Sequence, residues 1–334
     1  MKQRILTGDR PSGKLHLGHY VGSLRNRVAL QDECDEYILV ADIQALTDNF
    51  HQPERVRENI TEVVLDYLSV GIDPERATIV LQSQVPEIAE LAILLMNLVR
   101  VSRLQRNPTV KAEIVQRGMA DNNATVGFMV YPVHQAADIL SFAADLVPVG
   151  NDQLPMIEQA RELVIKFNHI YGETLVMPQA KLSEYPRLPG TDGSSKMGKS
   201  LGNVINLSDS AQEVRRKVMG MYTDPNRKHA TDPGKVEGNP LFVYHDAFNP
   251  NIGEVTDFKE RYVQGRVGDV EVKTSLVAVL NEMLEPFRDR RAYAQSQHGL
   301  VRDVLEAGTK KARLVTCDVM GKVREAMRID FFRR

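Results

Sequence analysis

Strand-like and helix-like segments alternate along the first 170 residues of the chain. The short apolar runs typical of strands are residues 4–7, 37–41, 78–82 and 145–149. The runs with helical spacing are residues 17–31, 54–70, 87–105 and 153–170. This alternation predicts an α/β fold, a Rossmann-like parallel sheet with helices on both faces. Ligands of such sheets bind beyond the carboxyl ends of the strands.

The remainder of the chain is predicted to be helical. Ser210 and Glu213 have the spacing of a capping box, and helical periodicity dominates the later sequence. We therefore expect two domains. They are residues 1–205, Rossmann-like with a loop-rich insertion at about 106–126 and a mobile loop at about 189–203, and residues 206–334, helical.

The first of two short motifs is His16-Leu17-Gly18-His19, which follows the first predicted strand and a turn. It opens a predicted helix, so backbone N–H groups and a partial positive charge point at whatever binds there. Two imidazoles around a glycine let a polyphosphate approach the backbone closely. The motif therefore predicts a phosphate site.

The second motif, Lys196-Met197-Gly198-Lys199-Ser200, lies about 180 residues further on. Its lysines supply cations that can follow the charge developing on phosphates during a displacement. The string from Gly193 to Ser200 also satisfies the P-loop pattern. A P-loop joins a buried strand to a helix, whereas residues 186–192 are not strand-like and residues 201–206 begin a helix poorly. The sequence therefore disfavours a P-loop.

Three polar residues, Tyr131, Gln135 and Asp138, recur at the spacing of one helix face among apolar neighbours. A buried face carrying polar groups must supply them with partners. Asp138 could accept the N–H of an indole, because the indole nitrogen is only a donor. The alternative is a carboxylate satisfied by its own helix.

The overall net charge of −2 does not indicate a nucleic-acid partner, but the charge is unevenly distributed. Residues 288–334 hold 12 Lys and Arg against 6 Asp and Glu. Such a segment can attract phosphate backbones, and the alternative is a solvated helix face. Two distant cysteines, Cys34 and Cys317, fit a reducing cytoplasm. No apolar run reaches 18 residues, so we expect no membrane partner.

Together the two motifs resemble the signature of class I aminoacyl-tRNA synthetases, whose usual forms are His-Ile-Gly-His and Lys-Met-Ser-Lys-Ser. Further strings are similar in order and spacing to the bacterial tryptophanyl-tRNA synthetases. They are Gly8 to Gly13, Gly71 to Pro74, Tyr131 to Ile139 and Val147 to Gln153. The resemblance runs from about residue 4 to about residue 220. It implies that L-tryptophan is activated by ATP with Mg²⁺ and passed to tRNA(Trp), by a cytoplasmic homodimer whose residues 206–334 bind tRNA.

The resemblance also implies roles for residues at matching positions. Catalysis is implied for His16, His19, Lys196 and Lys199. ATP binding is implied for Arg10, Pro11, Ser12, Gly18, His19, Gly150, Asn151, Asp152, Leu188, Lys196, Met197, Gly198, Lys199 and Ser200. Tryptophan binding is implied for Tyr131, Gln135, Asp138 and Gln153. No metal ligand from the protein is implied.

Four positions depart from common bacterial relatives. Gly198 replaces a serine, Arg10 a glutamine, Gln44 a histidine and Gln135 a methionine. Together these departures look like an auxiliary, second type of the enzyme. We expect them to affect the catalytic rate and the amino-acid affinity more than the reaction type.

Three alternatives stay open at this point. A tyrosyl-tRNA synthetase shares the architecture, and an acid can equally bind a phenol. A coenzyme adenylyltransferase also uses His-x-Gly-His, but would act on a nucleotide and not on tRNA. A non-aminoacylating paralogue would bind tryptophan without releasing pyrophosphate.

Overall fold

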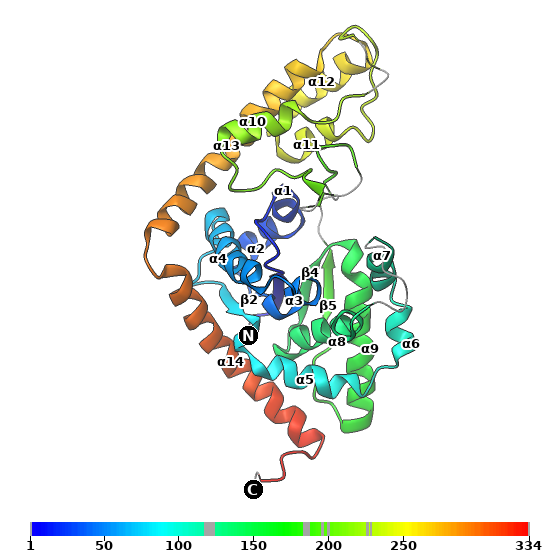
Figure 1. Cartoon of the computed structure of the whole chain (residues 1–334), viewed down its shortest axis with the longest axis vertical. Coiled ribbons are helices and arrows are strands. Elements are labelled where there is room, and N and C mark those ends of the chain that lie inside the picture. The colour runs from blue at the N-terminus through cyan, green and yellow to red at the C-terminus, as the bar shows by residue number, and fades with distance from the viewer. Residues whose placement is uncertain are drawn as a thin grey trace.

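The computed structural model describes most of the chain, which is drawn in Figure 1. The described residues are 2–116, 124–182, 188–194, 197–198, 201–224, 227 and 229–332. The roles predicted for Lys196, Lys199 and Ser200 therefore concern residues outside this part, as does a portion of the predicted insertion at 106–126.

A parallel sheet of five strands lies at the centre, in the order β3-β2-β1-β4-β5. The strands are β1 (Arg4–Asp9), β2 (Asp35–Val40), β3 (Thr78–Leu81), β4 (Leu146–Val149) and β5 (Gln179–Leu182). The first four confirm the predicted strands. The fifth was not predicted, because its four residues are all exposed and polar residues interrupt any apolar run. The strand order reverses between β1 and β4, which is where open α/β sheets bind ligands.

Helices cover both faces of this sheet, which confirms the predicted fold class (Figure 1). One face carries α1 (Leu17–His19), η1 (Tyr20–Leu24), α2 (Arg25–Leu30) and α4 (Pro53–Val70). The other carries α5 (Pro86–Met96), α8 (Val126–Ser141) and α9 (Leu154–Tyr171). Along β2, Ile38 and Val40 belong to one core, and Tyr37 and Leu39 belong to the other. Such alternation is what a strand buried on both faces requires.

Several local features differ from the prediction. The helix expected over 17–31 contains the π-helical turn η1, and the helix expected over 87–105 divides into α5 and α6 (Val101–Gln105). Part of the predicted loop-rich insertion forms α7 (Pro108–Gln116). The Asn107 side chain accepts the N–H of Thr109 at 3.0 Å, so Asn107 and Pro108 start a helix where the sequence indicated a turn. A short helix, α3 (Asp42–Asn49), also follows β2.

The later helices extend the molecule away from the sheet and then return to it. They are α10 (Ala211–Met219), α11 (Pro240–Phe248), α12 (Ile252–Val263), α13 (Asp269–Ser296) and α14 (Leu300–Ala326). In Figure 1, α10 to α12 and the start of α13 form a tip, and α13 leads back to the sheet. Ser210 and Glu213 form the predicted capping box at the start of α10. Within the described ranges, no helix has the length and apolarity needed to cross a membrane.

Helix α14 packs against the edge strand β3. A Cβ added to Gly308 would lie 2.0 Å from the backbone oxygen of Ile79, so only glycine permits this approach. Next to it, Leu81 donates its backbone N–H to the hydroxyl of Thr309 at 3.1 Å. The helix thus covers an edge that would otherwise offer unpaired backbone groups.

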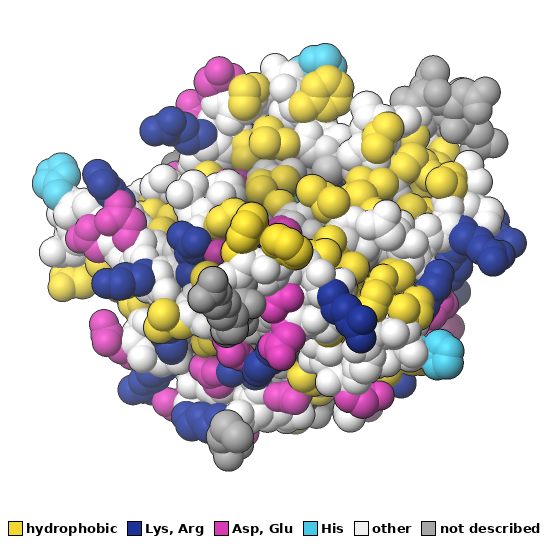
Figure 2. Space-filling view, turned by 90° about the horizontal axis from the view of Figure 1, so that it is seen from below, with side chains coloured by type: hydrophobic (Ala, Val, Ile, Leu, Met, Phe, Trp, Pro, Cys, Tyr) yellow, Lys and Arg dark blue, Asp and Glu magenta, His cyan; other side chains and the backbone are white. Residues whose placement is uncertain are grey.

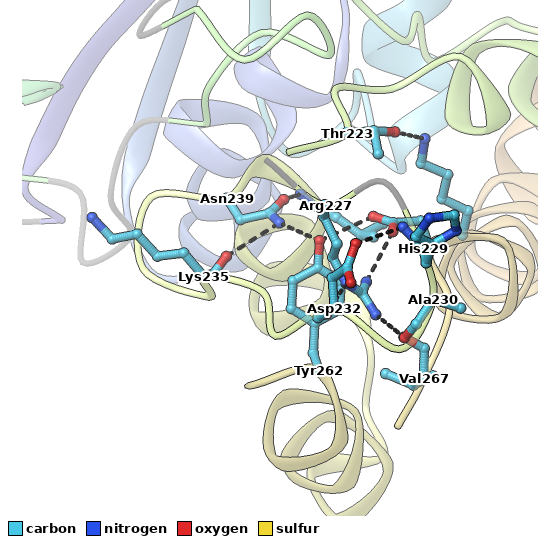
Figure 3. A network of polar contacts seen from close by, with 12 residues as sticks. Thr223, Arg227, His229, Ala230, Asp232, Lys235, Asn239, Tyr262 and Val267 are labelled. Atoms are coloured by element: carbon cyan, nitrogen blue, oxygen red, sulfur yellow. Dashed lines mark hydrogen bonds and ion pairs between the residues drawn. The ribbon is translucent and has the colours of Figure 1, made fainter. Parts of the chain in front are cut away.

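The tip is held together by buried Arg227, the centre of the network in Figure 3. Its guanidinium donates to the backbone oxygens of Ala230 and Asp232 at 2.8 Å and pairs with Asp269 at 2.9 Å. The same group lies 3.9 Å from the ring centroid of Tyr262, whose hydroxyl donates to Asp269 at 3.0 Å. One side chain therefore fastens the long loop before α11 to α12 and α13.

Much of the basic excess in residues 288–334 contacts acids elsewhere in the chain. Arg313 of α14 pairs with Glu87 of α5 at 2.9 Å, and Arg324 pairs with Glu90. These contacts fasten α14 to the sheet domain. The charges therefore serve in part as internal anchors, which neither of the two interpretations of this segment anticipated.

Candidate active site

A cavity of about 840 Å³ opens at the switch between β1 and β4. The predicted site residues that line it are Arg10, Ser12, His16, His19, Tyr131, Gln135, Asp138, Gly150, Asp152, Gln153 and Met197. The described residues predicted for the site that do not line it are Pro11, Gly18, Asn151, Leu188 and Gly198. A larger groove of about 1500 Å³ between α4 and α14 contains none of the predicted residues. The cavity at the sheet edge therefore joins both motifs and the polar face of α8.

The two histidines of the first motif lie against each other, with ring centroids 3.9 Å apart. His16 Nδ1 accepts the N–H of Gly18 at 3.1 Å, and His19 Nδ1 accepts the N–H of His16 at 3.2 Å. Because both Nδ1 atoms are acceptors, the proton of each neutral ring lies on Nε2. Each Nε2 is then a hydrogen-bond donor suited to a phosphate oxygen.

The two motifs meet at Gly18. A Cβ there would lie 2.9 Å from His16 Nδ1 and 3.0 Å from the sulfur of Met197. The glycine therefore accommodates neighbouring side chains, whereas the sequence suggested room for a ligand. Leu17 also donates its N–H to Ile205 at 2.9 Å, and Leu207 donates to Leu15 at 3.0 Å. This short pairing places the chain after the second motif beside the first.

Asn203 organises the loop that carries the second motif. Its buried side chain accepts the N–H of Gly198 at 2.8 Å and donates to Asp192 at 3.0 Å and to Ser194 at 2.9 Å. The N–H of Gly198 is thus engaged within the loop, whereas a P-loop would direct it at phosphate. Sequence reasoning missed Asn203 because its partners are brought together only by the folded loop.

A buried ion pair lies at the carboxyl end of β1. Arg27 contacts Asp9 at 2.7 Å, and the Tyr67 hydroxyl donates to the same carboxylate at 2.9 Å. Burial opposes ionisation of Asp9, but Arg27 and the nearby His19 lower its pKa to about 2. Arg10, on the following turn, lines the cavity and pairs with Asp48 of α3 at 3.2 Å.

Asp138 lies in the opposite wall and is only 4% exposed. Burial raises the pKa of its carboxyl to about 8, although a hydrogen bond from Gln82 partly opposes that change. Gln82 Nε2 donates to Asp138 Oδ1 at 2.7 Å. Gln82 belongs to η2 (Gln82–Gln84), so this partner comes from outside helix α8. A polar residue at the end of a predicted strand was the signal that could have identified it.

Two glutamines connect α8 to the segment after β4. Gln135 Nε2 donates to Gln153 Oε1 at 3.4 Å. Gln153 closes η3 (Asn151–Gln153) through its backbone N–H, which donates to Gly150 at 3.0 Å. Its side chain donates to Asp152 at 3.3 Å. These amides present donors and acceptors between the acid of α8 and the carboxyl end of β4.

Comparison with known proteins agrees with this geometry. The model of class I tRNA synthetases (W and Y) matches residues 1–285. The tryptophan–tRNA ligase of Clostridium longisporum is 53% identical over 336 residues, with 99% of this chain and 98% of the relative covered. That of a Streptococcus pyogenes serotype M3 strain is 52% identical over 339 residues, with 99% of each covered.

Solved structures give the same result. The tryptophanyl-tRNA synthetase from Campylobacter jejuni, complexed with ADP and tryptophan, superposes with a TM-score of 0.84 at 30% identity, covering 97% of this chain and 99% of that one. A tyrosyl-tRNA synthetase from Archaeoglobus fulgidus, complexed with L-tyrosine, has a TM-score of 0.67 at 25% identity, covering 87% and 90%.

The chain belongs to the class I aminoacyl-tRNA synthetases, in the group that comprises the tryptophan and tyrosine enzymes. Within that group, the relatives that share about half of its residues over the whole length are tryptophan–tRNA ligases.

Proposed function

We propose that the chain activates L-tryptophan with ATP and transfers it to tRNA(Trp). A carboxylate oxygen of tryptophan attacks the α-phosphorus of ATP. The bond from that phosphorus to the bridging oxygen breaks, and its electron pair leaves with pyrophosphate. The tryptophanyl-adenylate then gives its acyl group to a hydroxyl of the terminal ribose of tRNA, and AMP departs.

No side chain needs to act as a nucleophile in this sequence, so catalysis consists of positioning and charge stabilisation. The Nε2–H groups of His16 and His19 would donate to phosphate oxygens. Lys196 and Lys199 would follow the charge that develops on pyrophosphate, and Mg²⁺ would bind with ATP on the same oxygens. The remaining predicted ATP contacts would surround the nucleotide from the turns after β1 and β4.

The observation that carries the proposal is one cavity lined both by a buried acid and by two imidazoles whose Nδ1 atoms accept backbone N–H groups. Asp138 would accept the indole N–H. Tyr131, Gln135 and Gln153 would hold the amino and carboxylate groups of the amino acid. This arrangement supports the order tryptophan, α-phosphate, pyrophosphate across the cavity.

The test is ATP–pyrophosphate exchange with each of the twenty amino acids, followed by charging of tRNA(Trp) and tRNA(Tyr). We expect exchange with L-tryptophan alone and charging of tRNA(Trp). Exchange with tyrosine would establish the tyrosyl alternative, since the same architecture serves both. Tryptophan binding without exchange would establish the non-aminoacylating paralogue.

The wider assembly follows from the same proposal. Residues 206–334 would bind tRNA, and two copies of the chain would form a cytoplasmic dimer. Figure 2 shows that apolar side chains gather on the end of the molecule away from the tip, and Ile93 of α5 and Val101 of α6 are exposed. Such a surface suits association of two copies. The auxiliary character inferred from Arg10, Gln44, Gln135 and Gly198 stays a prediction.

A further inference from the structure

The inference concerns Gln82, a fully buried glutamine behind the cavity. It lies directly after β3, where α3, η2 and α8 meet. Its side chain contacts the other two elements: α3 through the backbone of Gln44 and α8 through Asp138. Gln82 does not itself line the cavity.

The orientation of the Gln82 amide follows from one backbone group. The N–H of Gln44 donates to Gln82 Oε1 at 3.1 Å, and a backbone N–H can only donate. The amide oxygen must therefore face α3, and the amide nitrogen must face α8. There Nε2 lies 2.7 Å from Asp138 Oδ1 and 3.4 Å from His134 Nδ1.

The fixed amide of Gln82 determines the orientation of the Asp138 carboxylate. Its Oδ1 receives a hydrogen bond from a side chain that cannot turn over without breaking its bond to Gln44. A carboxylate held at one oxygen keeps its plane, and the other oxygen then keeps a defined direction. We propose that Gln82 is a positioning residue for tryptophan specificity, which holds Asp138 so that one oxygen accepts the indole N–H. This inference rests on the proposed function and names a residue that acts behind the binding site.

The charged and titratable groups around Asp138 agree with this role. Asp42 of α3 opposes ionisation of Asp138, and its own carboxylate accepts the N–H of Ser83 at 2.9 Å. His134 has a lowered pKa because it is buried, so it is neutral near pH 7. The amide of Gln82 is therefore the group that favours the ionised form of Asp138, which is the better acceptor for an indole.

The experiment compares Gln82→Met with Gln31→Met in the full-length protein. Gln31 is a matched control: it is also buried, donates to Gly71 at 3.2 Å and accepts from Asp73 at 2.9 Å, and does not line the cavity. Gln31→Met removes two hydrogen bonds. Gln82→Met removes the bonds to Gln44 and Asp138 and the longer contact to His134. Both substitutions keep a side chain of similar size. We would measure kcat/KM for L-tryptophan, KM for ATP, and inhibition by 3-benzothienyl-L-alanine, which has sulfur in place of the ring N–H.

For Gln82→Met, we expect kcat/KM for tryptophan to fall about tenfold, as for the loss of one hydrogen bond to a charged group. The inhibition constant of the sulfur analogue and the KM for ATP should stay unchanged. Gln31→Met should alter none of these values. An equal loss for tryptophan and the analogue, or the same loss in Gln31→Met, would overturn the proposal.

A double-mutant cycle tests whether Gln82 acts through Asp138. In the Asp138→Asn background, Gln82→Met should cause no further loss of tryptophan activation. A full additional tenfold loss would contradict the inference. If the unmodified chain exchanged pyrophosphate with no amino acid, the proposed function would fail by itself. The role of Gln82 would then be tested by calorimetric titration with L-tryptophan, where Gln82→Met should weaken binding about tenfold.

Discussion

Leu15 donates its backbone N–H to the buried carboxylate of Asp66, with a distance of 2.7 Å from N to Oδ2. Leu15 directly precedes the first histidine of the site. Asp66 lies on α4, and its other oxygen contacts Arg291 of α13 at 2.5 Å. Arg291 also pairs with Glu62 at 2.7 Å. One carboxylate therefore connects the helix that leads to the tip with the backbone that carries His16.

Replacing Arg291 by Met should destabilise the protein by about 3–5 kcal/mol, because it leaves the Asp66 charge buried without its partner. Burial raises the pKa of Asp66 to about 6, and Arg291 opposes that change. Protonation of Asp66 removes the buried charge. The loss in the free energy of unfolding should therefore be smaller at pH 5.5 than at pH 8. Urea unfolding at both pH values measures this. A deficit that is independent of pH would show that lost packing alone is responsible.

Replacing Glu36 by Gln should raise stability at alkaline pH. Both carboxylate oxygens of Glu36 are buried with no hydrogen-bond partner in the described part of the chain. Burial raises its pKa from 4.5 to about 7, although Arg27 opposes this. The folded state then holds a proton that the unfolded state releases, so stability falls as pH rises from about 4.5 to 7. At roughly 1.4 kcal/mol per pH unit, the total loss in the free energy of unfolding is about 3 kcal/mol.

The measurement for Glu36→Gln is thermal unfolding at pH 5 and pH 8. The unfolding temperature of the variant, relative to that of the unmodified protein, should be higher at pH 8 than at pH 5. Glu33→Gln, on the exposed turn before β2, is the control and should show no such gain. Parallel pH dependence of the variant and the unmodified protein would exclude Glu36 as the titrating group.

Replacing Asp138 by Asn should weaken tryptophan activation by about 1–3 kcal/mol while ATP affinity changes little. Because the pKa of Asp138 is about 8, the unmodified protein should bind tryptophan more tightly as pH rises through that value and the stronger acceptor forms. The Asn variant should lack this dependence. Calorimetric titrations from pH 6.5 to 9 measure both effects, and a pH dependence that persists in the variant would assign it to another group.

Replacing Lys199 by Ala should slow adenylate formation far more than it weakens tryptophan binding. Its charge is needed mainly as pyrophosphate departs. Single-turnover formation of the adenylate and equilibrium binding of tryptophan separate the two effects. Complete loss of ATP binding, together with ATP hydrolysis independent of tryptophan, would instead support a P-loop.

Replacing Gly198 by Ser should be tolerated and should leave the rate unchanged or faster. Gly198 is not among the glycines with positive φ. An added Cβ would lie 3.2 Å from side-chain atoms of Leu201, which is exposed and free to shift. The substitution also reduces the entropy lost on ordering the loop, by about 0.5–1 kcal/mol. A large loss in single-turnover rate would mean that the loop needs glycine in a conformation reached only during the reaction.

Sequence reasoning predicted the sheet because β1 to β4 are apolar runs with helical segments between them. It also selected residues from both motifs and from α8 that line one cavity, since their order and spacing are distinctive. It missed Gln82, although the position of that residue at the end of a predicted strand was a signal. It could not identify Asn203 or Asp66, because each is a single polar residue whose partners are brought near it only by the fold. Their roles depend on which backbone N–H groups the fold brings near them.

The position of the last helix could not be predicted from the sequence for the same reason. Truncation near residue 286 removes Arg291 and the whole of α14, whose Val304, Leu305, Val319 and Val323 are buried. Helical periodicity reveals that such residues face something, but not that the partner is a distant sheet. We therefore expect a chain truncated there to be less stable, because it loses these buried residues and the Arg291–Asp66 ion pair.

The packing of α14 against β3 joins two elements that are synthesised at very different times. Thr309 follows Leu81 by 228 residues. At ribosomal rates of about 5–20 residues per second, roughly 10 to 45 s separate the two. During that interval the β3 edge stays open on a growing chain and can pair with a neighbouring nascent chain on the same messenger. A chain whose synthesis stops before Gly308 would keep an unpaired β3 edge. We therefore expect chaperones to be needed most during this late stage of synthesis.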